Sequence, residues 1–389
     1  MRTTMATENN NKTLNVPNLR FPEFSGEWGK TKFENIVSLQ RGSSPRPIIE
    51  YITKSEDGVN WVKIGDMPAS GRIVTRTEEK ITREGAKKSR HVKIGDLILS
   101  NSMSFGQPYI MGIEGYIHDG WFVLRNYEKS LVRDYLCNLL ISPSIQQQYK
   151  RLAAGGVVQN ISSELVNSVI VSVPTKTEQK KIAEFISYID DRIATQIKII
   201  EKFESLIKGL YERLFNIDGA AYIQLGNVAK IQKGQQINGK ELSEIGSYYV
   251  MNGGVVPSGY LEDFNTPANT ISISEGGNSC GYVQYNGVPF WSGGHCYTLI
   301  EPINSFNYKY LFNYLKFKEQ SIMALRIGSG LPNIQKKDLE RFPILNVSKE
   351  EQDKMACIFD DILDRIICER QIALKYEEQK KYLLSNLFI

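Results

Sequence analysis

Two long stretches of this chain repeat apolar residues at alternating steps of four and three, which is the spacing of a heptad helix seam. In the first stretch, positions 182, 186, 189, 193, 200, 203, 207, 210 and 214 hold Ile, Phe or Leu, and position 196 holds Gln. In the second, the seam runs from Met355 to Leu387 and is interrupted by Glu369 and Lys380. A helix of about 38 residues would be roughly 57 Å long, which favours a coiled coil over packing on one domain surface.

The two stretches are copies of each other. The segment Glu178–Phe215 recurs as Glu351–Phe388, an offset of 173 residues, and 15 of the 38 aligned positions are identical without a gap. The shared positions include a Glu-Gln pair at the start, an Asp-Arg-Ile triplet and a Leu-Phe pair at the end. Matches spread over this length at one fixed offset predict an internal duplication.

Connectivity decides how the two helices pair. The first helix leads into the segment between them, and the second leads away from it, so a pair must be antiparallel. Pseudo-twofold pairing would place Gln196 against Glu369, the midpoints of the two seams. We predict that this polar layer sets the register of the pair.

The segments that precede each helix are predicted to be α+β. Short apolar or alternating runs, separated by Gly, Asn, Ser and Pro, indicate strands. The strand runs are Trp61–Ile64, Asp96–Ser100, Trp121–Leu124, Thr270–Ser274 and Cys296–Ile300, and helical pattern appears near 130–152 and 307–326. The prediction is therefore two pseudo-twofold-related α/β domains separated by a long antiparallel two-helix coiled coil. The expected divisions are an N-terminal segment 1–29, domain one 30–176, helix one 177–216, domain two 217–347 and helix two 348–389.

Composition narrows the class of protein. No apolar run reaches the ~18 residues of a membrane span, and the polar N-terminus has no signal-peptide core, so we expect a cytoplasmic protein without membrane contact. Five cysteines without a CxxC pair favour reduced thiols, and no metal site is indicated. Residues 30–176 hold 20 basic and 14 acidic side chains, whereas 220–347 hold 10 and 9. The basic bias of the first domain is compatible with a polyanionic partner.

Catalytic motifs are weak in this sequence. The chain has only three histidines, so the sequence offers few candidates for catalysis by histidine. The stretch Gly234–Lys240 imitates a phosphate-binding loop, but Glu241 stands where Ser or Thr must hold magnesium. Asp66 with Glu78 loosely imitates a nuclease set, and domain two has no counterpart. We therefore predict no catalytic residue in this chain.

The loops instead carry side chains that suit DNA. Arg and Lys can meet phosphate and guanine, and Asn and Gln can form paired hydrogen bonds with adenine. The candidate DNA-binding residues are Arg41, Ser43, Ser44, Arg46, Lys87, Lys88, Arg90, Asn101, Ser102, Gln107, Lys233, Gln235, Gln236, Asn238, Lys240 and Asn278.

The chain resembles the specificity subunit of Type I restriction-modification systems over nearly its whole length. The marks are the run from Val16 to Trp28, Gly42-Ser43-Ser44-Pro45, the run Gly95–Ser100, Pro332-Asn333-Ile334 and the Glu-Gln pair that opens each long helix. Domain two departs from the pattern, because it has Gln235-Gln236-Ile237 where domain one has Ser44-Pro45.

The resemblance implies two target recognition domains that each read one half of a split site in double-stranded DNA, with the coiled coil setting the gap. Such subunits do not catalyse and bind no cofactor. They assemble with two methyltransferase subunits, which use S-adenosylmethionine to methylate adenine, and with motor-nuclease subunits that use ATP and Mg.

Three alternatives stay open. The chain could serve a methylation-only or differently assembled restriction system, or it could be a coiled-coil scaffold that presents two ligand-binding β-rich domains. A nuclease that uses Asp66 and Glu78 is the third.

Overall fold

The computed structural model describes residues 2–3, 14–68, 71–101, 106–153, 161–303, 305–328, 330 and 332–389. The chain forms two compact units, one of Met1–Lys198 with Gln371–Ile389 and one of Ile199–Arg370. The division falls inside both long helices, α5 (Lys176–Phe215) and α9 (Lys349–Asn386). Each unit therefore contains one half of each helix.

Unit one is built on two five-stranded sheets. The first has the order β4 (Ser38–Arg41), β13 (Trp121–Arg125), β10 (Leu97–Ser100), β11 (Pro108–Met111) and β7 (Ile73–Val74). The second has the order β5 (Ile52–Thr53), β8 (Glu79–Ile81), β6 (Val59–Val62), β12 (Gly115–Ile117) and β9 (Arg90–Val92). Two small antiparallel pairs add β1 (Arg2–Thr3) with β2 (Leu19–Arg20), and β3 (Gly29–Lys32) with β14 (Ile170–Val173).

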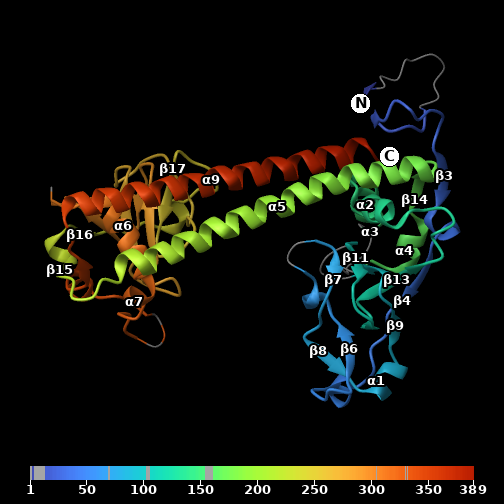
Figure 1. Cartoon of the computed structure of the whole chain (residues 1–389), viewed down its shortest axis with the longest axis horizontal. Coiled ribbons are helices and arrows are strands. Elements are labelled where there is room, and N and C mark those ends of the chain that lie inside the picture. The colour runs from blue at the N-terminus through green and yellow to red at the C-terminus, as the bar shows by residue number, and fades with distance from the viewer. Residues whose placement is uncertain are drawn as a thin grey trace. The chain divides into compact units, whose positions relative to one another are not determined.

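The helices of unit one lie mostly after the strands. They are α1 (Arg83–Lys87), α2 (Arg133–Ile141), α3 (Pro143–Ala153) and α4 (Ser163–Ser168), with short 3-10 turns η1 (Phe33–Asn35), η2 (Ile48–Glu50) and η3 (Ile64–Asp66). Helix α2 lies between the start of α5 and the strands, and its buried face joins both in one hydrophobic core (Figure 1). The position of α2 explains why its residues 135–140 are almost all buried.

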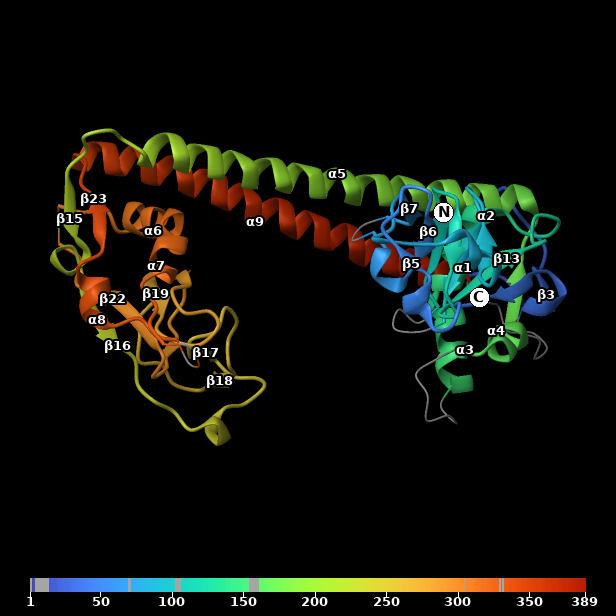
Figure 2. The ribbon, with the colours of Figure 1, turned by 90° about the horizontal axis from the view of Figure 1, so that it is seen from below.

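Unit two repeats this plan with shorter sheets. Its sheets have the orders β16 (Lys230–Lys233), β22 (Cys296–Ile300), β19 (Thr270–Ser274), β20 (Val283–Asn286) and β18 (Tyr260–Leu261), β17 (Tyr248–Met251), β21 (Trp291–Ser292). The small pair is β15 (Tyr222–Gln224) with β23 (Pro343–Leu345), and the helical elements are η4 (Leu225–Asn227), η5 (Gly239–Glu241), α6 (Tyr308–Phe317), α7 (Glu319–Met323) and α8 (Lys336–Glu340). Helix α6 lies between the long helices and the strands, as α2 does in unit one (Figure 2).

The repeated topology confirms the duplicated α+β fold that the sequence predicts. The order β4-β13-β10-β11 matches β16-β22-β19-β20, and the parallel pair β6-β12 matches β17-β21. The predicted strands Thr270–Ser274 and Cys296–Ile300 have the predicted bounds. The predicted strand Trp61–Ile64 is wrong at its end, because Asp66 accepts the Lys63 N–H at 2.7 Å and turns the chain into η3.

Within each unit the halves of α5 and α9 pack antiparallel. In unit one, Asp190 pairs with Lys380, and Arg192 donates to the Tyr376 hydroxyl at 3.3 Å. In unit two, Arg370 donates to Glu204 at 2.6 Å. Residues early in one helix therefore meet residues late in the other.

The end of each long helix packs into the domain that precedes the other helix. Phe388, at the end of α9, has its ring 5.2 Å from that of Tyr135 in α2. Phe215, at the end of α5, has its ring 5.7 Å from that of Tyr310 in α6. These are the Leu-Phe ends that the sequence repeats, and burial in a domain core explains why an aromatic residue stands there.

Near the end of α5 the buried face is wider than the predicted heptad seam. Leu210 and Leu214, the expected seam positions, are half-buried against the core of unit two, whereas Tyr211 and Phe215 are buried more deeply, at 7% and 1% exposure. An α-helix advances slightly out of step with a heptad repeat, and here the aromatic cluster of unit two takes the next residue along.

A buried glutamine fastens each long helix to its domain. The Gln179 amide, 0% exposed, accepts the Val132 N–H at 2.8 Å and donates to the Ser130 and Pro174 carbonyls at 2.9 and 3.0 Å. Gln352, 1% exposed, accepts the Asn307 N–H at 2.8 Å and donates to the Val347 carbonyl at 2.9 Å. Both amides satisfy backbone groups at the start of α2 or α6, which explains the Gln of the repeated Glu-Gln pair.

The Glu of the repeated pair has a different environment in each unit. Glu178 is buried and takes a two-pronged contact from Arg20, at 2.7 and 2.9 Å, together with the Trp28 indole N–H at 3.3 Å. Glu351 is exposed and caps its own helix through Ser348, which lowers its pKa. The segment from Val16 to Trp28 therefore covers the start of α5 in unit one.

The polar layer stays a prediction. Gln196 and Glu369 are both buried, at 7% and 3% exposure, and the Glu369 carboxylate accepts from Arg365 at 2.5 Å.

Among the described cysteines, Cys137, Cys280 and Cys296 are buried, whereas Cys357 and Cys368 are exposed. In the described part of the chain, no helix has the length and apolar character needed to cross a membrane.

Substitution of Gln179 by Ala should lower the free energy of unfolding by about 2–4 kcal/mol, because it leaves one buried N–H and two carbonyls without a partner. Urea denaturation followed by far-UV circular dichroism measures the loss. Gln371→Ala, on the exposed face of α9, is the matched control and should change stability by less than about 0.5 kcal/mol. Equal stabilities for the two variants would contradict the fastening role.

Candidate functional site

In both units the chain passes close over a turn between two other strands directly after β4 or β16, the strand at the edge of its sheet. Gly42 follows β4 and donates its N–H to the Trp121 carbonyl at 2.8 Å, and Gly234 follows β16 and donates to the Cys296 carbonyl at 2.8 Å. A Cβ on Gly42 would lie 2.0 Å from the His118 carbonyl oxygen, and one on Gly234 would lie 2.3 Å from that of Gly293. Only glycine fits this close approach, so the crossing explains the matched glycines.

The next residue makes the same backbone contact in each unit. Ser43 donates its N–H to the Ile117 carbonyl at 3.2 Å, and Gln235 donates to that of Ser292 at 2.9 Å. We call residues 41–46 and 233–240 the crossing loops. The backbone of the two loops is thus held alike, whereas their side chains differ.

Asp119 organises the crossing loop of unit one. Its carboxylate accepts Ser44 Oγ at 2.8 Å and Arg46 at 3.2 Å, while its backbone carbonyl accepts the Asn101 amide at 2.8 Å and Arg41 Nε at 3.2 Å. Four residues predicted from the sequence therefore meet at one aspartate that the sequence analysis missed. Asp119 could have been predicted from its position in the turn directly before β13, because β13 begins at Trp121 and pairs with β4, the strand that leads into the crossing loop.

Burial and hydrogen bonding set the charges at this point. Burial alone would raise the pKa of Asp119, but the hydrogen bond from Ser44, a backbone N–H and the neighbouring His118 together lower it below the usual range. Burial lowers the pKa of His118, against the opposing pull of Asp119. At neutral pH the site thus holds a charged carboxylate beside a neutral imidazole.

Further cations surround the loop. Ser43 Oγ donates to the Lys88 carbonyl at 2.9 Å, and Arg90 Nε donates to the Arg41 carbonyl at 3.2 Å. The Lys88 ammonium bonds the Tyr51 hydroxyl and lies 4.6 Å from the centre of that ring. Lys87 is exposed at the end of α1. The end of α1, β9 and the crossing loop therefore gather the predicted basic residues on one surface.

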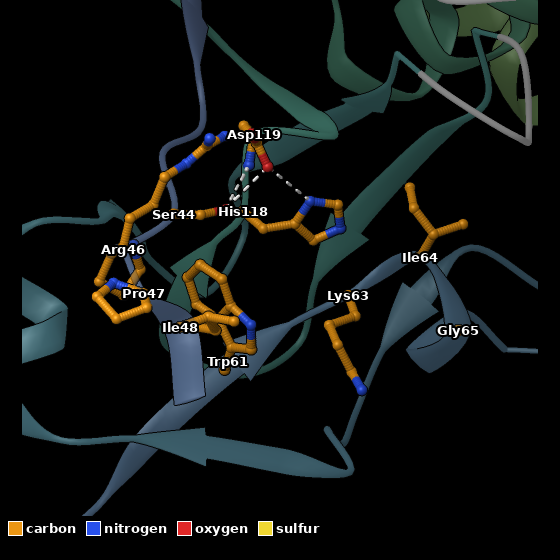
Figure 3. Close-up of a pocket in the computed structure, with 11 residues that line it drawn as sticks. Ser44, Arg46, Pro47, Ile48, Trp61, Lys63, Ile64, Gly65, His118 and Asp119 are labelled. Carbon is orange, nitrogen blue, oxygen red and sulfur yellow. Dashed lines mark hydrogen bonds and ion pairs between the residues drawn. The ribbon is translucent and has the colours of Figure 1, made fainter. Parts of the chain in front are cut away.

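A cavity of about 1030 Å³ opens beside this surface (Figure 3). Its lining residues are Ser44, Pro45, Arg46, Pro47, Ile48, Trp61, Lys63, Ile64, Gly65, His118 and Asp119. Apolar side chains from the crossing loop, η2, β6 and η3 form most of the wall, and Trp61 and His118 have ring centres 6.1 Å apart. This cavity was not predicted from the sequence because its wall comes from three stretches of chain, 44–48, 61–65 and 118–119, that meet only in the fold.

In unit two the crossing loop meets a buried carboxylate. Lys233 donates to Glu275 Oε1 at 2.6 Å, and the Tyr297 hydroxyl donates to the same oxygen at 3.1 Å. Glu275 lies where Asn101 lies in unit one: the N–H of each donates to the turn before β22 or β13, and the carbonyl of each accepts from Ile334 or Ile161. A carboxylate thus replaces an amide at the same place in the fold.

The other predicted residues of unit two are exposed. Trp291 donates its indole N–H to the Gln235 carbonyl at 3.3 Å, and Asn238 caps η5 by accepting the Lys240 N–H at 3.1 Å. Gln236 and Asn278 also face solvent. These residues lie on exposed loops beside the second crossing.

Two residues of unit one that the sequence predicted to contact DNA, Asn101 and Gln107, are buried or half-buried in the domain. Asn101 is 3% exposed and its amide is engaged by the Asp119 carbonyl, which favours a role in holding the turn over a contact with DNA. Gln107 is half-buried, and its N–H donates to Ser100 Oγ at 3.0 Å. Ser102 lies outside the described residues.

The weak catalytic motifs have structural roles where the chain is described. The Asp66 carboxylate accepts the N–H groups of Lys63 and Glu78, at 2.7 and 2.9 Å, so it holds backbone in place. The stretch from Gly234 leads into the three-residue turn η5 instead of a long helix. Among the described residues, no three His, Cys, Asp or Glu side chains are grouped to hold a metal ion.

Comparison with known proteins gives one consistent family. Residues 26–205 and 218–377 each match the Type I restriction modification DNA specificity domain. The type I restriction enzyme MjaIX specificity subunit of Methanocaldococcus jannaschii is 20% identical over 93% of this chain and 92% of its own length. A Mycoplasma genitalium protein named as a type I specificity subunit is 32% identical over 40% of this chain, and that match spans 42% of the relative. Another from Mycoplasma pneumoniae is 36% identical over 31% of this chain and 32% of its own length.

Solved structures share the fold. The crystal structure of a Type I restriction-modification S subunit from M. genitalium aligns with a TM-score of 0.61 at 20% identity, covering 96% of this chain and 99% of that one. A chain from a study of complex assembly and conformational transition of the type I R-M system aligns with a TM-score of 0.60 at 15% identity, covering 92% and 96%.

Substitution of Gly42 by Ala should cost about 1–3 kcal/mol of stability, because the new Cβ meets backbone that cannot move without shifting β12. Thermal unfolding of the purified chain measures the cost. Gly239→Ala in the other crossing loop adds a Cβ with nothing within 4 Å, so it controls for the substitution and should unfold like the unaltered chain. A Gly42→Ala variant as stable as this control would show that the crossing is not tight.

Proposed function

Because this chain belongs to the Type I restriction-modification DNA specificity family, with two copies of the domain, we propose that it reads a two-part DNA sequence. Each unit reads one half of the site through its crossing loop and the loops around it. The chain itself performs no chemistry in this proposal.

The carrying observation is the pair of crossing loops. Their backbones are held by equivalent hydrogen bonds at equivalent places in a duplicated fold, while the side chains that they present differ. A fixed backbone with variable side chains is what two readers of different half-sites need. Sequence is read by side chains that reach base edges, whereas the scaffold only has to place them.

The two units use different chemistry. Unit one gathers Arg41, Arg46, Lys87, Lys88 and Arg90 around its crossing loop, which suits phosphates and guanine. The candidate residues of unit two are four amides and two lysines, and the amides suit base edges such as adenine. Phosphate contacts position a protein on the duplex and make binding sensitive to salt. We therefore assign unit one the larger electrostatic share of binding.

The paired long helices set the gap between the half-sites in this proposal. Two readers on one spacer would meet half-sites about one helical turn apart on the same face of the duplex, roughly 34 Å. Within each unit, buried glutamine and aromatic contacts fasten the helices to the domain, which supports a spacer of fixed length.

The partners follow from the same family. We propose that the chain recruits two methyltransferase subunits, which bind S-adenosylmethionine and methylate adenine, and motor-nuclease subunits, which use ATP and Mg. A related chain was solved in a study of complex assembly of the type I R-M system, which supports recruitment. A methylation-only system would lack the motor nuclease.

A scaffold that presents its domains to a neutral ligand is the alternative from a different class. The DNA reader and the scaffold differ in how binding depends on salt. DNA binding releases counterions and weakens steeply as salt rises, whereas binding of a neutral ligand does not. A flat response to salt between 50 and about 200 mM would favour the scaffold.

Co-expression of the chain with its methylating partner in a host free of adenine methylation should produce methylated adenines in one split motif with a fixed gap. Long-read sequencing that detects modified bases identifies the motif. Expression of the partner alone is the control and should leave that motif unmethylated. Methylation at scattered sites, or none, would contradict the proposed function.

A seven-residue insertion in both long helices, after Lys198 and after Arg370, should lengthen the preferred gap while the half-sites stay the same. One heptad adds roughly 10.5 Å of helix, or about three base pairs at 3.4 Å each, and keeps the seam in register. Binding to duplexes with graded gaps measures the shift. The same insertion after Asp218, outside both helices, should leave the preferred gap unchanged, and an unchanged gap in the helix variant would contradict the ruler.

A further inference from the structure

The cavity beside the crossing loop of unit one has the make-up of a binding site for a flat aromatic group. Its volume of about 1030 Å³ is at the upper end of small-ligand sites, which run from about 300 to 1,000 Å³. Pro47, Ile48 and Ile64 supply apolar wall, and Trp61 and His118 supply rings (Figure 3). An apolar wall of this kind is unexpected beside basic and polar loop residues, and it indicates a place for an apolar or aromatic group.

The polar groups of the cavity can orient an occupant. His118 is neutral at neutral pH because burial lowers its pKa, and its Nδ1 accepts the Gly120 N–H at 2.8 Å. That tautomer leaves Nε2 as a hydrogen-bond donor. At the rim, Arg46 is 81% exposed while it contacts Asp119. The site thus combines an apolar wall, a neutral donor and a cation at its mouth.

An exposed apolar side chain stands next to the cavity. Ile49 is 80% exposed on η2, between Ile48, which lines the cavity, and Glu50. Proteins that unstack DNA insert apolar wedges of this kind, Ile among them, between neighbouring bases. Enzymes and proteins that extrude a base then hold it in a pocket with stacking and hydrogen bonds.

Unit two does not repeat these features at the matching places. The strand register that pairs Trp61 with β12 pairs Val250 with β21. The turn that holds His118 and Asp119 in unit one holds Gly293 and Gly294 in unit two, and Gln236 lies against Gly294. The ring, the imidazole and the carboxylate therefore belong to unit one alone among these equivalent positions.

We propose that this cavity receives one nucleobase turned out of the duplex in the half-site read by unit one, with Ile49 as the wedge and Trp61 and His118 beside the base. The inference rests on the proposed function, since it needs DNA on this surface. The pocket lies on the recognition chain itself and so differs from any base pocket of a methylating partner.

Mismatch scanning tests the proposal. A duplex carrying the mapped split motif is given a mismatch at one position after another, and affinity for the complex of the chain with its methylating partner is measured by fluorescence anisotropy. A mismatch removes part of the cost of unpairing. At the extruded pair it should therefore tighten binding by about tenfold, whereas mismatches at other read pairs weaken binding.

Gly65→Phe supplies the blocking variant. Gly65 lines the cavity, and a Cβ there meets nothing within 4 Å, so the ring can fill the space without disturbing the core. Gly287→Phe in unit two, where a Cβ also meets nothing within 4 Å, is the matched control. The mismatch advantage should vanish in Gly65→Phe, fall several-fold in Ile49→Ala and persist in Gly287→Phe.

The outcomes separate the two proposals. If the motif is bound but no mismatch in this half-site tightens binding, or if the advantage survives Gly65→Phe, the cavity does not hold a base and the proposed function stands. If the motif is not bound at all, both proposals fail.

Free nucleotides form a second arm. Titration with dAMP, dCMP, dGMP and dTMP should give no saturable binding at micromolar concentration, because the wedge and the duplex supply most of the contact. Saturable binding that Gly65→Phe abolishes, without any mismatch advantage, would assign the cavity to a free nucleotide and overturn the proposal.

Discussion

The buried amide at the start of each long helix is the contact on which the rest of the structure depends. Gln179 and Gln352 satisfy backbone groups at the start of α2 and α6 that would otherwise be buried without a partner. Because an unpaired buried backbone group costs about 1–3 kcal/mol, each helix is held to its domain in one orientation. The helix ends add a second attachment, since Phe388 and Phe215 pack against Tyr135 and Tyr310. One repeat alone would lack the aromatic residue that completes its core, so the fold needs both copies.

This arrangement separates what must stay constant from what can vary. The helices, the glutamines and the crossing glycines are shared by the two repeats, because each makes the same kind of backbone or core contact in both units. The side chains on the crossing loops have no such contact in common. Asn101 and Glu275 occupy the same place, and the residue facing them changes with them: Arg41 bonds a backbone carbonyl, whereas Lys233 bonds the Glu275 carboxylate. Each crossing loop is thus held by a residue that differs between the units, Asn101 in one and Glu275 in the other, and the loop residue that meets it differs as well.

Sequence reasoning succeeded where the physical signal is periodic or duplicated. The long helices, the strands at Thr270–Ser274 and Cys296–Ile300 and the antiparallel packing follow from spacing and repetition, whereas the family was inferred from a resemblance of short motifs. It failed where one tertiary contact decides. The end of β6 depends on a carboxylate cap from Asp66, and the deep burial of Tyr211 and Phe215 beside the seam of α5 depends on rings from other segments. For the candidate site, polarity identified the basic loop residues, but a polar residue type does not distinguish the exposed Arg46 from the buried Asn101. Asp119, Trp61 and the cavity needed the fold, because their neighbours are far away in sequence.

The asymmetry between the units has an energetic consequence for the proposed reader. Basic residues in unit one attract any duplex, so they add affinity without choosing a sequence, and alone they would hold the chain on the wrong DNA. Unit two presents four amides and two lysines, of which Lys233 is already engaged by the Glu275 carboxylate, so it gains less from bare phosphate and depends more on matching base edges. The chain then binds the correct split site tightly and selectively only if both units contact the same duplex at the same time. In the proposed reader, a spacer of fixed length makes the second contact depend on the first, which would favour keeping the helices alike in the two repeats.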